Sequence, residues 1–376
     1  MKVLQITPEA PGNKSGGQRG VLQSLLSLKG VNKKIEVIDF VGPRIFDETI
    51  KQLYRKTYEL EPTKSIIKQI LILLHGETNK RYYAWKNCKI DFTKYDLIFI
   101  DFTKMDYVIR DIRKLNKSIR IITRVHNVEL DYANADYNNK KNIKKWFVKI
   151  FTKKQEKYIS DNSDKLLFLS EKDYSRFNEL YHVANNKKII VPVCVNGPKE
   201  ITNASKKIKN LLITGSLWFG SNAEGIFWLI NNVLKKVKYP YNLTIAGSHP
   251  TEELKQICKM NKITLIDSPE NMEPLFIDSD ILLIPIFDGA GMKVKFAEGL
   301  SYGKVIISTT FGAVGYDIEN ERNCFIADAP NLFAEYITKC LIMSDKDFEQ
   351  IKQIARSLYE EKYSIDACIK YYEDFL

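Results

Sequence analysis

Short apolar runs alternate with polar, helix-compatible stretches along the whole chain. Near-continuous apolar runs are typical of strands buried on both faces, as in parallel sheets. Alternation of such strands with helices predicts an α/β protein with two Rossmann-like domains that face each other across a cleft. The runs lie at 3–6, 35–41, 97–101, 119–125, 165–169 and 189–193 in the first half, and at 211–214, 243–246, 263–266, 281–286 and 305–308 in the second.

A polar segment without periodicity, 197–209, separates the two series and predicts an interdomain linker. We therefore expect an N-terminal domain over 1–196 and a C-terminal domain over 210–358. The last stretch, 359–376, alternates aromatic and charged residues and predicts a terminal helix. A chain of 376 residues is long enough for two separate cores.

Two glycine-bearing loops follow predicted strands. The loop 7–20 contains Gly16 and Gly17 and precedes an apolar-faced helix that ends at Gly30. Ligands of parallel sheets bind beyond the carboxyl ends of strands, where glycines let backbone amides approach a phosphate. The second loop, after 281–286, contains Gly289, Ala290, Gly291 and Met292, followed by Lys293 and Lys295. For each loop, spacing alone leaves two interpretations open: a phosphate-binding loop, or a tight turn, with solvated lysines in the second loop.

Residues 296–305 read Phe-Ala-Glu-Gly-Leu-Ser-Tyr-Gly-Lys-Val. With the preceding glycine loop and lysine pair, they resemble the nucleotide-sugar-binding segment of retaining GT-B glycosyltransferases, in particular family four (glycosyl transferases group 1). The resemblance implies that Glu298 binds the ribose hydroxyls of the nucleotide. Ala290 departs from the pattern, because many members have there a glutamate that holds the donor sugar. In the GT-B fold the last helix crosses back to the first domain. We therefore expect 359–376 to be that helix and to pack on the N-terminal domain.

The segment 215–222, Gly-Ser-Leu-Trp-Phe-Gly-Ser-Asn, follows the first strand of the second half. It resembles the loop that clamps the donor diphosphate in this family, with Gly215 and Ser216 beside the donor. Ser216 and Ser221 stand where that loop has its arginine and lysine. We infer that Lys293 and Lys295 supply the positive charge instead. The Gly16–Gly17 pair resembles the first-domain loop that faces the donor phosphates.

His126 directly follows the predicted strand 119–125. A lone histidine is more often a core or surface residue, and that alternative is open on spacing alone. The segment His-Asn-Val-Glu resembles, however, the family motif whose histidine contacts the donor sugar near the reacting carbon, which implies a catalytic role. No metal motif is apparent, and we interpret 278–280, Asp-Ser-Asp, as a helix end. We expect neither a metal nor a cofactor beyond the nucleotide diphosphate sugar, which is a substrate.

The resemblance implies a retaining, metal-independent glycosyltransferase of the hexosyltransferase class. It would move a sugar from a nucleotide diphosphate sugar to a hydroxyl of a glycan or lipid-linked acceptor, in cell-surface polysaccharide or glycoconjugate synthesis. Two alternatives stay open. One is a nucleotide-sugar epimerase of the same fold. The other is a non-catalytic GT-B partner subunit, which Ala290 suggests because it replaces the glutamate that holds the donor sugar.

Positive charge is concentrated in the first half of the chain. Residues 1–196 contain 37 basic and 22 acidic residues, whereas 197–376 contain 20 and 24. Such asymmetry favours a polyanionic partner, and because no nucleic-acid-binding module is recognisable we expect an anionic membrane surface rather than nucleic acid. The segment 138–157 has eight lysines and one acid, and a helix would align Ile143, Trp146 and Phe147 in one stripe. A core-facing helix is the alternative.

Six scattered cysteines without a Cys-x-x-Cys pair favour a reducing compartment. The N-terminal apolar run is too short for a signal peptide, and no stretch approaches the length of a membrane span. We therefore expect a cytoplasmic protein that associates peripherally with the cytoplasmic face of the membrane.

Overall fold

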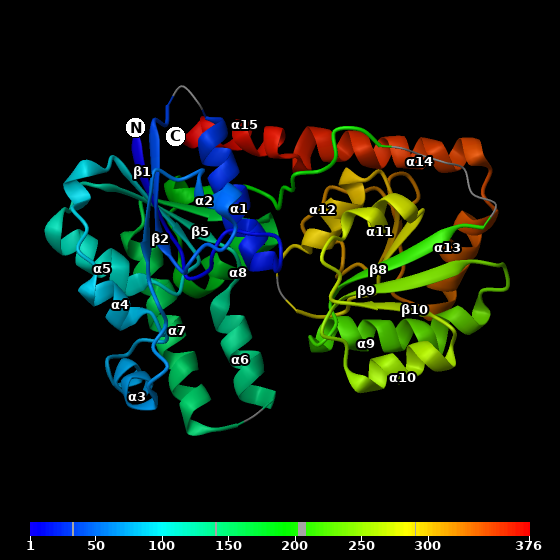
Figure 1. Ribbon diagram of the computed structural model, residues 1–376, viewed down its shortest axis with the longest axis horizontal. Helices are drawn as coiled ribbons and strands as arrows, with labels where there is room; N and C mark the ends of the chain where they lie inside the picture. Colours follow the sequence, from blue (N-terminus) through cyan, green and yellow to red (C-terminus); the bar gives the residue numbers. More distant parts are fainter. Residues whose placement is uncertain (32–33, 140, 202–207, 290) are drawn as a thin grey trace. The chain divides into compact units, whose positions relative to one another are not determined.

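A computed structural model describes residues 1–31, 34–139, 141–201, 208–289 and 291–376. The chain forms two compact units: the first comprises Met1–Pro192 and Cys368–Leu376, and the second comprises Val193–Ala367. Each unit contains one parallel sheet with helices packed around it (Figure 1). The predicted α/β class, with two parallel sheets, is confirmed. Of the expected linker 197–209, residues 202–207 lie outside the described residues.

The sheet of the first unit has seven strands in the order β3-β2-β1-β4-β5-β6-β7. The chain adds strands on one side of β1 up to β3 and then returns to its other side with β4. The strand order therefore reverses between β1 and β4, the place where ligands bind in open α/β sheets. The strands are β1 (Lys2–Ile6), β2 (Val37–Gly42), β3 (Lys56–Glu59), β4 (Leu97–Asp101), β5 (Arg120–Val125), β6 (Lys165–Phe168) and β7 (Lys188–Ile190).

Nine α-helices among the described residues belong wholly or partly to this unit. They are α1 (Gly16–Gly30), α2 (Glu48–Lys51), α3 (Ile66–Leu74), α4 (Tyr82–Asn87), α5 (Asp106–Leu115), α6 (Glu129–Asn139), α7 (Ile143–Asn162), α8 (Glu171–Tyr181) and α15 (Ile365–Phe375).

The second unit has six strands in the order β10-β9-β8-β11-β12-β13, so its order reverses between β8 and β11. The strands are β8 (Asn210–Ser216), β9 (Asn242–Ser248), β10 (Thr264–Asp267), β11 (Ile281–Ile284), β12 (Val305–Ser308) and β13 (Phe325–Ile326). The α-helices are α9 (Gly220–Trp228), α10 (Glu252–Met260), α11 (Glu273–Asp278), α12 (Val294–Ser301), α13 (Pro330–Ile342) and α14 (Asp345–Leu358).

Each unit has its own hydrophobic core, built on the central strands of its sheet. All residues of β4, β11 and β12 are buried, as continuous apolar strands covered on both faces require. Among the described residues, no helix is long and apolar enough to cross a membrane.

The helix α1 begins earlier than the sequence predicts. Gly16 and Gly17, expected in a loop that runs to Gly20, form its first turn. The reason is Ser15, whose side chain accepts a hydrogen bond from the amide of Gln18 at 3.1 Å and so caps the helix.

The prediction of one helix over 359–376 is wrong about where that helix begins. Tyr359–Tyr363 is a π-helical turn that continues α14, and Ser364 is extended. The Ser364 hydroxyl accepts a hydrogen bond from the amide of Ala367 at 3.0 Å, so α15 begins only at Ile365. Residues 359–367 lie in the second unit, and Cys368–Leu376 lie in the first.

Candidate functional site

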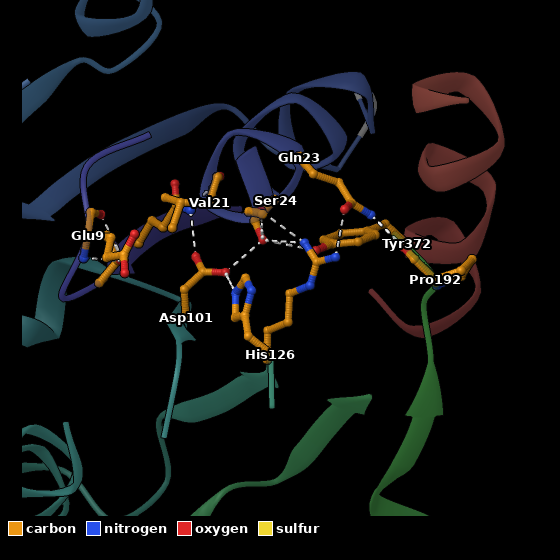
Figure 2. A network of polar contacts seen from close by, with 12 residues as sticks. Glu9, Val21, Gln23, Ser24, Asp101, His126, Pro192 and Tyr372 are labelled. Carbon is orange, nitrogen blue, oxygen red and sulfur yellow. Dashed lines mark hydrogen bonds and ion pairs between the residues drawn. The ribbon is translucent and has the colours of Figure 1, made fainter. Parts of the chain in front are cut away.

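In the first unit, polar side chains meet where β4 and β5 end beside α1 (Figure 2). Nε2 of His126, which follows β5, lies 3.0 Å from Oδ1 of Asp101, the last residue of β4. Asp101 also accepts hydrogen bonds from the Ser24 hydroxyl at 2.8 Å and from the Gln5 amide at 2.7 Å. This fully buried carboxylate therefore has partners on both oxygens and fixes the orientation of the imidazole.

The surroundings of His126 favour its neutral form. Burial lowers the pKa of His126, and the hydrogen bond to Asp101 opposes that shift only in part. The ring also stacks on Phe102, with ring centroids 3.9 Å apart. Because Nε2–H of the neutral ring donates to the Asp101 carboxylate, Nδ1 carries no proton. A Cβ added at Gly20 would lie 2.7 Å from this Nδ1, so the ring needs a glycine there.

The backbone under the ring is strained. Phe102 has a φ of 71°, a left-handed conformation that is uncommon outside glycine, and its amide donates to the Arg124 carbonyl at 3.0 Å. Strain of this kind is found at functional sites, where surrounding contacts hold it in place. The conformation places Phe102 directly against the histidine ring.

Arg124 connects this site to α1. Its buried guanidinium donates to the Gly20 carbonyl and the Ser24 hydroxyl, both at 3.0 Å, and to Oε1 of Gln23 at 2.7 Å. From α15, the Tyr372 hydroxyl lies 3.5 Å from the Ser24 hydroxyl (Figure 2). The C-terminal helix thus supports the scaffold of the histidine site.

Gly17 lies beside a carboxylate, that of Glu9, to which sequence reasoning gave no role. A Cβ at Gly17 would be 2.4 Å from Oε2 of Glu9, and the Ser15 hydroxyl lies 3.4 Å from the same oxygen. Burial raises the pKa of Glu9. Because helix N-termini attract anions, a phosphate at this position would compete with Glu9. Donor contact by Gly16 and Gly17 stays a prediction.

In the second unit, Lys295 is fixed at the carboxyl end of β8. Its Nζ donates to Oδ1 of Asn222 at 2.9 Å and to the Thr214 carbonyl. Gly215 has a φ of 152°, and a Cβ there would lie 2.7 Å from the Lys295 Nζ. The Asn222 amide in turn donates to the Ser216 carbonyl at 3.0 Å. Asn222 lies at the end of the segment 215–222 that resembles the diphosphate loop, but sequence reasoning gave it no role of its own.

Lys293 approaches the same loops from the end of β11. Its Nζ donates to the Gly291 carbonyl at 3.0 Å. A Cβ at Gly289 would be 3.6 Å from this Nζ and 3.8 Å from the Ser221 hydroxyl. Gly289 and Gly291 have φ values of 113° and 65°, which glycine adopts without strain. The structure therefore brings both lysines, the loop that begins at Gly215 and the loop that contains Gly289 to the point where the strand order of the second sheet reverses.

The remaining predicted donor residues lie on or before α12. Glu298 is half-buried on this helix, one turn after Lys295, and Met292 is buried. Ala290 lies outside the described residues. The donor-contacting roles of these residues stay predictions. Asp101, by contrast, was missed although the rule that ligands bind at strand ends points to the last residue of 97–101.

Within the described ranges, no group of three or more His, Cys, Asp or Glu could hold a metal ion. Of the Asp-Ser-Asp segment, Asp278 is the last residue of α11, and Asp280 accepts a hydrogen bond from the amide of Asn210 at 2.7 Å. The interpretation of this segment as a helix end is confirmed.

Residues 208–342 match the family model described as "Glycosyl transferases group 1". An uncharacterized 44.6 kDa protein in the cps region of Klebsiella pneumoniae is 29% identical over 251 residues, which are 62% of this chain and 62% of that protein. The chain thus spans about three-fifths of the length of the curated relative that it matches.

Solved structures match along nearly the whole chain. A glycosyltransferase from Rickettsia africae has a TM-score of 0.71 at 15% identity, covering 99% of this chain and 97% of that one. HepE from Anabaena, solved in complex with UDP, has a TM-score of 0.71 at 11% identity, covering 100% of this chain and 99% of that one. Sucrose-phosphate synthase from Thermosynechococcus elongatus has a TM-score of 0.70 at 13% identity, covering 100% of this chain and 98% of that one. The chain therefore has the GT-B fold, and residues 208–342 of its second unit match the group 1 glycosyltransferase model.

Proposed function

We propose that the protein is a retaining, metal-independent glycosyltransferase that takes its sugar from a nucleotide diphosphate sugar. The observation that carries this proposal is the convergence of Lys293 and Lys295 with two glycine loops at the carboxyl ends of β8 and β11. Ammonium groups and accessible backbone amides are what a diphosphate needs. Anabaena HepE, which has the same fold, was solved with UDP and with UDP-glucose, which supports a nucleotide sugar as donor.

The chemistry follows from the charge that develops during transfer. As the glycosidic bond breaks, the diphosphate leaving group gains negative charge, and fixed cations aimed at it lower the barrier. Lys295, held by Asn222 and Thr214, is such a cation. We assign the donor-sugar contact to His126, whose neutral imidazole is held in place by Asp101 and Phe102. Glu298 is assigned to the ribose hydroxyls.

The acceptor in this proposal is a hydroxyl of a glycan or of a lipid-linked glycan. The relative from a cps region of Klebsiella pneumoniae supports a role in surface polysaccharide synthesis. A lipid-linked acceptor would place the protein on the cytoplasmic face of the membrane, with the basic segment 138–157 of the first unit against anionic lipid.

Isothermal titration with UDP, GDP and their sugars tests this proposal, followed by product analysis of the sugar nucleotide that binds. We expect one nucleotide to bind and its sugar to be transferred with the anomeric configuration retained, which NMR of the product reports. A non-catalytic partner subunit would bind none of these ligands. An epimerase would release free nucleotide and a changed sugar without any acceptor. Either result would contradict the proposal.

A further inference from the structure

The helix α3 exposes an unusual amount of apolar surface. Its sequence, Ile-Ile-Lys-Gln-Ile-Leu-Ile-Leu-Leu, has seven apolar residues, of which only Ile72 is buried. Ile67 and Leu74 are 71% and 77% exposed. A nine-residue helix is marginal in water without packing of its apolar face, and apolar patches of this size mark interaction sites. The helix therefore lacks the burial that its composition requires.

The first half of α7 has the same character. Ile143, Trp146 and Phe147 are exposed, and Trp146 and Phe147 pack edge to face with ring centroids 5.1 Å apart. The second half differs, because Gln155, Glu156 and Ile159 are buried in the first unit. The core-facing alternative thus holds for the second half of α7 only, and the aromatic half faces away from the core.

The two helices are neighbours. The turn that ends α3 packs on α7, because a Cβ at Gly76 would lie 3.8 Å from the Phe151 ring. Next to it, the Gln155 amide donates to Oε2 of Glu77 at 3.0 Å, and the Thr78 hydroxyl donates to Oε1 of Gln155 at 3.0 Å. Figure 1 shows α3 beside the lower part of α7. We call the exposed apolar residues of both helices the two-helix surface: Ile66, Ile67, Ile70, Leu71, Leu74, Ile143, Trp146 and Phe147.

The positive charge around the two-helix surface indicates which kind of partner could cover it. Residues 62–76 contain two lysines and no acid, and residues 137–155 contain seven lysines and no acid. A second copy of the chain docked here through a twofold interface would bring like charges together, which is unfavourable. An anionic bilayer complements both features, since apolar side chains enter the acyl boundary while lysines meet the headgroups.

We propose that α3 and the first half of α7 together form a lipid-insertion surface for an anionic bilayer, with α3 as its main apolar element. The sequence pattern pointed to the lysine-rich segment of α7 alone, and the structure adds α3. The inference deepens the proposed function, because it commits the acceptor to a substrate at the membrane. It does not depend on the donor site, which lies in the second unit.

Co-sedimentation with phosphatidylglycerol vesicles tests the two-helix surface, and the chain offers a matched pair of leucines. Leu74 and Leu115 each end a helix of the first unit and are 77% and 74% exposed. We expect the wild type and Leu115→Glu to bind vesicles equally in low salt, with binding weakened by high salt. Leu74→Glu should lower the partition coefficient by on the order of tenfold or more, because it removes an inserted side chain and adds a repelled charge. Phe147→Glu should act in the same direction.

Calorimetric titration with UDP and GDP on the same samples separates the two proposals. Variants that keep UDP affinity and lose vesicle binding support the two-helix surface. Equal vesicle binding by Leu74→Glu and Leu115→Glu, or no binding of the wild type, overturns it while leaving the donor site standing. A vesicle-binding protein with affinity for neither UDP nor GDP contradicts the proposed function only. A wild-type dimer that Leu74→Glu converts to a monomer in sedimentation velocity would show that a second copy covers the surface, which also overturns the lipid proposal.

Discussion

His126 and Lys295 are both held by side chains to which sequence reasoning gave no role. Asp101 fixes the imidazole from the end of the neighbouring strand, and Asn222 fixes the ammonium group from the first turn of α9. Resemblance to a family pointed to the two functional residues, because each lies in a recognisable segment. Their partners come from segments 25 and 73 residues away in the chain, and only the folded sheet brings them together.

The role of His126 at the donor sugar is tested by His126→Ala. We expect the variant to keep its nucleotide affinity, because the donor lysines lie in the other unit, and to lose turnover. The measurements are calorimetric titration with the nucleotide and the rate of sugar transfer. A large drop in the thermal midpoint together with activity would instead indicate a structural histidine, which its 6% exposure also permits.

Gly20 gives a separate test of the same ring. Alanine normally stabilises a helix interior relative to glycine by about 1 kcal/mol. At position 20, however, the added Cβ would lie 2.4 Å from Cε1 of His126 and must displace the ring. We predict that Gly20→Ala lowers turnover without raising stability.

Gly220→Ala, at the first residue of α9, serves as the comparison for thermal stability only, because its added Cβ would meet only Oε1 of Glu224 at 3.6 Å, an ordinary contact. Thermal melts should show that this control is at least as stable as the wild type. Full activity of Gly20→Ala would contradict the placement of the ring against α1.

At the scale of elements, apolar runs predicted the central strands and the edge strands β7 and β10, and missed the other two edge strands, β3 and β13. The run 97–101 is β4 and the run 305–308 is β12, each with the bounds expected from the sequence. The edge strand β3 was missed because its sequence, Lys-Thr-Tyr-Glu, is polar and only half-buried. β13 has two residues, too few for a recognisable pattern. The start of α1 was predicted too late, because it is set by the capping hydrogen bond of Ser15, and the pattern of hydrophobic residues contains no information on such caps.

The turn after α3 is anchored by a buried charge cluster that makes stability depend on pH. Arg110 pairs with both Glu77 and Asp106. Burial, reinforced by Asp106, raises the pKa of Glu77 to about 8. The folded state therefore keeps a proton that the unfolded state has lost, so this contribution is present at low pH and is lost as the pH rises through about 8.

We predict that the free energy of unfolding of the wild type falls between pH 6 and pH 9 relative to that of Glu77→Gln. One proton limits the slope to about 1.4 kcal/mol per pH unit. Urea unfolding across this range measures the difference. Parallel pH profiles for the two proteins would show that Glu77 is ionised in the folded state at pH 6.

At the scale of the whole molecule, two hydrophobic cores predict unfolding in more than one step. The cores belong to different units, and all strands of the first sheet lie within 1–192 and all strands of the second within 193–367. The alternating pattern predicted two such sheets. It could not predict that the chain divides at Pro192 and again at Ala367, because those positions depend on packing between residues far apart in sequence.

Scanning calorimetry with UDP tests this arrangement. A ligand at 100 times its Kd adds about 2.7 kcal/mol to the state that binds it. Since Lys293, Lys295 and Glu298, which we propose hold the diphosphate and the ribose, lie in the second unit, UDP should raise the midpoint of one transition more than that of the other. Glu298→Gln should reduce this increase. An equal upward shift of a single, cooperative transition would contradict independent unfolding of the two cores.

The central claim is that a donor diphosphate binds at the reversal point of the second sheet through Lys293 and Lys295. Calorimetric titration of UDP and GDP into the wild type, Lys293→Ala, Lys295→Ala and the exposed-lysine control Lys238→Ala tests it most directly. Each lysine's charge-assisted contact with the diphosphate is worth about 1.5–3 kcal/mol, so Lys293→Ala and Lys295→Ala should each bind the recognised nucleotide about 10- to 150-fold more weakly. Lys238→Ala should bind as the wild type does. Unchanged nucleotide affinity in both Lys293→Ala and Lys295→Ala would contradict the claim.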